Sequence, residues 1–136
     1  MTAEEVKKTL DKIRYSTEDI QKKKNVLASI ELSTGPSAIR YDKDPVQSSP
    51  SNYNESAIIK ATELREEITE DYNRIDKIKR EMFDRIMQLK AHEEKSIIIY
   101  YYYDCLSYQE TGNKIGLSLS SVYRWEESAI QNLASI

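Results

Sequence analysis

A short segment near the C-terminus carries the side chains best suited to contact DNA. With helical spacing, its residues divide into an apolar face and a face that holds hydroxyls, an aromatic ring and one arginine. The guanidinium of Arg124 can pair with both major-groove acceptors of guanine, and the hydroxyls of Ser120 and Ser121 can bind phosphate at a helix N-terminus. The alternative for each is an ordinary solvated surface position. The expected buried face consists of Val122, Trp125, Ala129 and Leu133.

Two helices joined by a tight turn are needed to present that segment. Ser107 and Ser118 can each cap a helix, because a side-chain oxygen there accepts a bond from an otherwise unpaired N–H of the first turn. Gly116 lies just past Ile115, where helices often end in a left-handed residue that glycine tolerates. The pattern predicts a helix-turn-helix, whose second helix commonly enters the DNA major groove.

The charge distribution limits what one copy of this motif can do. The chain has a net charge of −3 at pH 7, and residues 92–136 alone contain six acidic and three basic side chains. Phosphate neutralisation provides most of the non-specific affinity for DNA, so a single copy should bind weakly. A dimer, a partner already on DNA, or basic residues from the rest of the chain is then required.

Other classes of function lack the residues that they need. His92 is the only histidine and Cys105 the only cysteine, so neither a histidine cluster nor a thiolate site can hold a metal. There is no glycine-rich phosphate loop. We therefore expect no enzyme, no catalytic residue, no cofactor and no metal. Cys105 is expected to be a small buried hydrophobe.

The same features suggest a protein of the bacterial host cytoplasm. A single cysteine suits a reducing compartment, and the charged N-terminus does not resemble a secretory signal. The longest apolar run, residues 97–103, is far too short to cross a bilayer. We therefore expect no membrane partner.

Two long amphipathic helices are predicted upstream. In residues 1–32 and 55–91, apolar side chains recur every seven residues, and charges of both signs cover the other faces. Such helices form either an antiparallel hairpin or a coiled-coil dimer. Residues 33–54 contain all three prolines, a glycine and five serines, and predict a flexible linker.

Residues 97–103, three isoleucines followed by four tyrosines, are ambiguous between helix and strand. Their strand propensity is high. A helix is nevertheless favoured, because Ile98, Tyr101, Tyr102 and Cys105 then share one face and because the neighbouring segments are helical. The tyrosines could stack on bases, but packing against the helix-turn-helix is the favoured interpretation.

The stretch from Leu89 to Leu133 resembles region 4 of the bacterial sigma-70 factors. The resemblance rests on residues 106–110 (LSYQE), 115–118 (IGLS) and 129–133 (AIQNL), with Val122 between them. The whole chain is similar to the ArpU/RinA type of sigma-like regulators of phages and prophages. Two positions depart from the family pattern: Thr111 replaces an apolar residue, and Gly112 replaces an alanine and weakens its helix by roughly 1 kcal/mol.

The resemblance implies an all-α fold, with a helix-turn-helix domain over residues 92–136. Glu126 and Glu127 are expected to point away from phosphate or toward a protein partner, because they would repel DNA. The implied DNA-binding residues are Leu119, Ser120, Ser121, Tyr123, Arg124 and Ser128.

The leading hypothesis is a sequence-specific, double-stranded DNA-binding transcription regulator of phage late genes. It would act as a dimer, with host RNA polymerase, or both. One alternative is a protein-interaction module that binds host polymerase or a repressor without DNA. Another is a packaging factor that resembles a small terminase subunit, although those usually place the DNA-binding part first.

Overall fold

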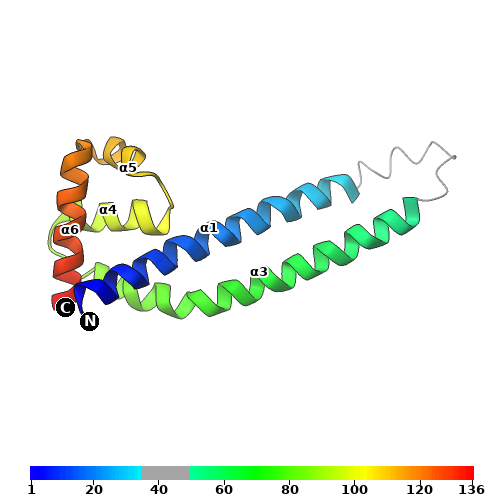
Figure 1. Ribbon diagram of the computed structural model, residues 1–136, viewed down its shortest axis with the longest axis horizontal. Helices are drawn as coiled ribbons and strands as arrows, with labels where there is room; N and C mark the ends of the chain where they lie inside the picture. The colour runs from blue at the N-terminus through cyan, green and yellow to red at the C-terminus, as the bar shows by residue number, and fades with distance from the viewer. Residues whose placement is uncertain (35–49) are drawn as a thin grey trace. The chain divides into compact units, whose positions relative to one another are not determined.

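The computed structural model describes residues 1–34 and 50–136, and their regular secondary structure is entirely helical (Figure 1). The predicted all-α class is confirmed. No helix of this part of the chain is both long and apolar enough to cross a membrane. The predicted flexible linker, residues 33–54, lies mostly outside the described residues. The elements are α1 (Ala3–Thr34), α3 (Pro50–Ile86), α4 (His92–Ile98), η2 (Ile99–Tyr103), α5 (Tyr108–Ile115) and α6 (Leu119–Ser135).

The chain divides into two compact units. Unit 1 consists of residues 1–18 and 74–136, and unit 2 of residues 19–73. In unit 2, α1 and α3 run antiparallel, because Lys23 Nζ lies 2.6 Å from Asp71 Oδ2 while Arg65 Nη2 lies 2.9 Å from Glu31 Oε1. Within this unit the helices therefore form the hairpin alternative. Asp71, which interrupts the apolar stripe, hydrogen-bonds Lys23 and raises the pKa of that amine.

The core of unit 1 joins segments far apart in the sequence. Side chains of the first half of α1 are fully buried together with those of α4, η2 and α6. Since burying one such side chain contributes about 1.5–3 kcal/mol, the first half of α1 is part of this fold. The sequence pattern alone did not indicate this association. The fully buried residues include Val6, Leu10, Ile13, Ile86, Ile97, Ile98, Tyr102, Val122, Ala129 and Leu133.

Residues 97–103 are helical, so the strand alternative is wrong. Ile97 and Ile98 are adjacent in sequence and both fully buried, whereas a strand would turn neighbours to opposite faces. The α-helix widens into the π-helix η2, and the N–H of Asp104 donates to the carbonyl of Ile99 at 2.9 Å. The next residue, Cys105, is half-buried with a positive φ of 59°. It ends the helix in a left-handed conformation, instead of filling the core as expected.

The predicted caps and turn of the helix-turn-helix are confirmed. The Ser107 hydroxyl accepts from the N–H of Glu110 at 3.0 Å, and the Glu110 carboxylate accepts from the N–H of Ser107, which completes a capping box. Gly116 is left-handed, with φ of 83°, and Ser118 caps α6 by accepting from the N–H of Ser121. These local bonds set where α5 ends and where α6 begins.

Candidate nucleic-acid interface

One face of α6 is exposed along its length. Ser120, Arg124, Glu127 and Gln131 follow one another at intervals of three or four residues and are all exposed. We call these four residues the α6 ridge. The opposite face is buried as predicted at Val122, Ala129 and Leu133, whereas Trp125 is only half-buried. The ridge is therefore the surface of α6 that can approach a duplex.

The six predicted DNA-binding residues divide between this ridge and its two flanks. Ser120 and Arg124 lie on the ridge. Leu119 and Tyr123 flank it on one side and are 40% and 46% exposed. Ser121 and Ser128 flank it on the other side and are half-buried. Whether any of the six contacts DNA stays a prediction.

Hydroxyls at the start of α6 hold the arginine in place. The Ser118 oxygen caps the helix and lies 3.0 Å from the Ser121 hydroxyl, and Arg124 Nη2 lies 3.2 Å from that same hydroxyl. Ser121 thus contacts Arg124 in the structure described, and its predicted contact with phosphate stays a prediction. The hydroxyl of Ser120 remains exposed beside them.

Two further ridge residues were not among the predicted DNA-binding residues. Glu127 was expected to point away from phosphate or toward a protein partner, and it lies on the exposed face with Arg124. Gln131 was not considered, although its spacing of seven residues from Arg124 was a usable signal. A glutamine can pair with adenine and a glutamate can accept from the amino group of cytosine. The ridge therefore offers a more varied set of base-reading groups than one arginine.

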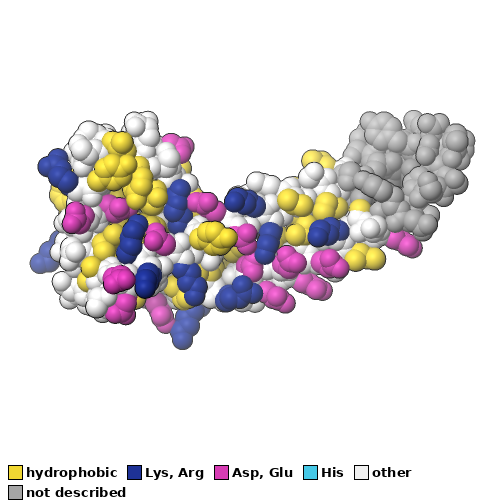
Figure 2. Space-filling model, viewed as in Figure 1, with side chains coloured by type: hydrophobic (Ala, Val, Ile, Leu, Met, Phe, Trp, Pro, Cys, Tyr) yellow, Lys and Arg dark blue, Asp and Glu magenta, His cyan; other side chains and the backbone are white. Residues whose placement is uncertain are grey.

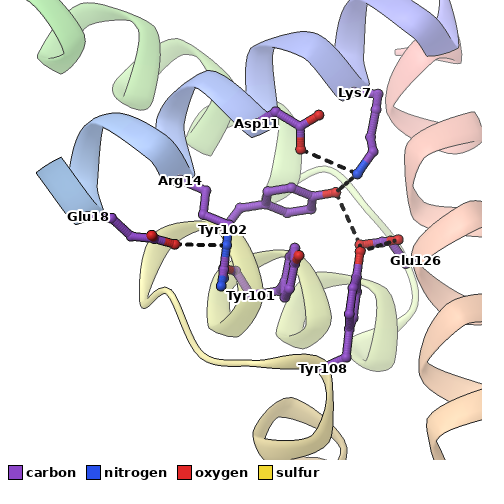
Figure 3. A network of polar contacts seen from close by, with 8 residues as sticks. All are labelled: Lys7, Asp11, Arg14, Glu18, Tyr101, Tyr102, Tyr108 and Glu126. Atoms are coloured by element: carbon purple, nitrogen blue, oxygen red, sulfur yellow. Dashed lines mark hydrogen bonds and ion pairs between the residues drawn. The ribbon is translucent and has the colours of Figure 1, made fainter.

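Glu126 points into the protein and not toward a partner. It is only 9% exposed, and its carboxylate accepts from the Tyr102 hydroxyl at 3.1 Å and from the Tyr108 hydroxyl at 3.1 and 3.2 Å (Figure 3). Lys7 Nζ in turn donates to the Tyr102 oxygen at 2.8 Å. Burial, followed by the charge of Glu126, raises the pKa of Tyr102, so this phenol keeps the proton that it donates.

A second set of contacts links α1 to α6 through stacked rings. The guanidinium of Arg14 lies 4.0 Å from the centroid of the Tyr101 ring, which stacks on Tyr108 at 4.0 Å. Tyr108 meets the edge of Tyr123 at 4.9 Å. Arg14 also donates to the carbonyls of Tyr101 and Leu106. The packing interpretation of the tyrosine run is therefore the one observed for Tyr101 and Tyr102.

The turn before α6 packs closely on α5. A Cβ added at Gly112 would lie 2.7 Å from the Leu117 carbonyl oxygen and 3.2 Å from Cγ2 of Val122. The N–H of Leu117 donates to the carbonyl oxygen of Gly112 at 2.9 Å. The close approach of the turn and of α6 therefore favours glycine at this position, although glycine lowers the helix propensity of α5. Beside it, Thr111 is fully buried, and no described residue accepts from or donates to its hydroxyl.

The unit that contains the ridge is not acidic as a whole. Residues 1–18 carry four basic and four acidic side chains, and residues 74–91 carry six basic and three acidic ones. Residues 92–136 carry three more acidic than basic side chains, so unit 1 as a whole has no net charge. Two of the acids in residues 92–136, Glu94 and Glu126, are buried and hydrogen-bonded. Figure 2 shows basic and acidic side chains interspersed on the visible face.

The matched family agrees with this geometry. Residues 91–135, which contain α4 to α6, match the family described as Sigma-70, region 4. This part of the chain is thus a region 4-like helix-turn-helix, a type of domain that binds DNA and regulates transcription. Neither the comparison with curated proteins nor that with solved structures found a match. Among the described residues, no group of three or more histidine, cysteine or carboxylate side chains could hold a metal ion.

Proposed function

We propose that the protein is a sequence-specific regulator of phage late genes that reads duplex DNA with the α6 ridge. The observation that carries the proposal is the exposed α6 ridge. The helix that bears it is capped at its N-terminus, buried along its opposite face, and part of the region 4-like segment. Arg124 reads guanine, Gln131 reads adenine, and Ser120 binds phosphate or a base edge. The architecture of the whole chain supports the assignment to phage-type regulators.

A single copy is not expected to bind DNA tightly. The ridge contains one arginine and one acidic residue, and unit 1 has no net charge, so little phosphate neutralisation is available. We therefore propose that the protein acts as a dimer or together with RNA polymerase. In unit 2, the apolar side chains of Val26, Ile58 and Ile59 are 49–58% exposed, which supports contacts of this unit with a second copy or a partner.

The test is a binding series with the full chain and the DNA upstream of the late operon of its own phage, at low and at physiological salt. Arg124→Ala should lose about 1–3 kcal/mol of discrimination between the preferred site and unrelated DNA. Arg80→Ala is the matched control, because its side chain is 75% exposed on α3 and pairs with Asp76. It should leave discrimination unchanged.

Two outcomes would count against the proposal. A folded protein without sequence preference at either salt would remove DNA reading from its function. Stoichiometric capture of RNA polymerase or a repressor without nucleic acid would then favour the protein-interaction module. Equal effects of Arg124→Ala and Arg80→Ala would remove Arg124 from the reading surface. Sedimentation of the protein alone tests the dimer, and a large ring would revive the packaging alternative.

A further inference from the structure

We propose that the first half of α1 positions the recognition helix, with Lys7 and Arg14 as positioning residues that act through the tyrosines on Glu126 and Tyr123. For its DNA readout, the proposal rests on the proposed function. Neither residue is expected to touch DNA. Their role is to keep α6 in the orientation that exposes the α6 ridge.

A series of hydrogen bonds connects α1 to the buried side of α6. Lys7 donates to the Tyr102 hydroxyl, which donates to Glu126, and Asp11 lies 3.3 Å from the same lysine (Figure 3). Tyr102 is fully buried, and Lys7 supplies the hydrogen bond that its hydroxyl oxygen accepts. The Glu126 carboxylate accepts from both Tyr102 and Tyr108, and each hydroxyl lies 3.1 Å from Oε2. A carboxylate held by two donors resists rotation of the helix that carries it.

The stacked rings meet the same side of α6 one turn earlier, at Tyr123. Arg14 is fixed by two backbone carbonyls and by an ion pair with Glu18 at 3.1 Å, and it covers one face of Tyr101. The stacked rings end at Tyr123, which lies beside the α6 ridge. Successive residues of a helix point about 100° apart. A rotation of α6 by a fraction of this angle would therefore turn Arg124 away from a base edge. The hydrogen bonds and the stacked rings meet α6 at Glu126 and Tyr123, about one turn apart. They add to the apolar packing of the opposite face in setting the orientation of α6.

This arrangement gives α1 a role beyond adding buried surface. Purely apolar packing tolerates substitutions of similar volume, whereas hydrogen bonds to a buried carboxylate have one geometry.

The experiment compares Lys7→Met with Lys8→Met in the full chain. Both changes replace a lysine of α1 by an apolar residue of similar length, but Lys8 is 76% exposed and lies 3.7 Å from Glu4 only. The first readout is quenching of Trp125 by acrylamide, well below the melting temperature. Trp125 is the only tryptophan, is half-buried on α6, and reports its packing without DNA. Lys7→Met should raise quenching, and Lys8→Met should not.

The second readout is the ratio of specific to non-specific DNA affinity. Lys7→Met should lower this ratio about tenfold, the equivalent of one hydrogen bond to a charged network, and leave the salt dependence unchanged. Tyr102→Phe retains the ring but removes the hydroxyl, and it should reproduce both effects. It takes the place of Lys7→Met in the comparison if Lys7→Met folds poorly. The proposal is overturned if Lys7→Met and Tyr102→Phe behave like Lys8→Met in the quenching assay. If the wild-type chain shows no DNA preference, the proposed function fails, and the quenching result alone decides on positioning.

Discussion

Replacement of Gly112 by alanine tests whether the close contact between the turn and α5 decides the residue at this position. In a free helix, alanine is more favourable than glycine by about 1 kcal/mol. In this protein, the added Cβ would lie 2.7 Å from the carbonyl oxygen of Leu117, a distance that Cβ atoms essentially never show. The two considerations predict opposite signs for the same substitution.

The packing term should prevail because the turn cannot easily move. The N–H groups of Gly116 and Leu117 both donate to the Gly112 carbonyl, at 2.8 and 2.9 Å, so displacing the Leu117 carbonyl strains bonds that end α5. Overpacking costs about 1–3 kcal/mol, and loss of one hydrogen bond adds about 1 kcal/mol. After the helix-propensity gain, we expect Gly112→Ala to destabilise the protein by about 1–3 kcal/mol. For a unit of this size, the melting temperature should fall by about 4–24 °C.

Thermal unfolding followed by circular dichroism measures this effect. Asn113→Ala is the matched control, because it adds alanine at the next, exposed position of α5 and brings a small gain in helix propensity without a clash. We expect its melting temperature to stay equal to that of the wild type or to rise slightly. If Gly112→Ala raised the melting temperature as Asn113→Ala does, the steric account of this turn would be wrong.

Two further substitutions examine the helix-turn-helix. Thr111→Val should raise the free energy of unfolding by about 1 kcal/mol in a urea titration, because it replaces a fully buried hydroxyl that no described residue satisfies; a loss of stability would show that the hydroxyl is satisfied after all. The bond from the Ser107 N–H lowers the pKa of Glu110 below its ordinary value of 4.5, so its contribution to stability is present above pH 4.5 and is lost as the pH falls through the lowered pKa. Wild type and Glu110→Gln should thus differ in melting temperature at neutral pH and converge in acid, and a difference independent of pH would contradict this account.

The sequence by itself determined the parts of the site that depend on neighbouring residues. Ser107 and Ser118 were predicted as caps, and Gly116 as the left-handed end of α5, because these rules concern groups within one helical turn. The buried face of α6 followed from its spacing, apart from the half-exposed Trp125. The same spacing could have identified Gln131 on the exposed face.

Only the tertiary structure decided the features that depend on distant residues. Glu126 is buried where Tyr102 and Tyr108 donate to it. Lys7 of α1, which is 95 positions from Tyr102, donates in turn to the Tyr102 hydroxyl. Gly112 is unfavourable by helix propensity alone, but the Leu117 carbonyl leaves no room for a Cβ at this position. Local spacing predicts which face of a helix is buried, whereas the group that meets that face depends on how the chain folds back. For this protein, that distinction separates the recognition helix, which the sequence revealed, from the contacts that orient it.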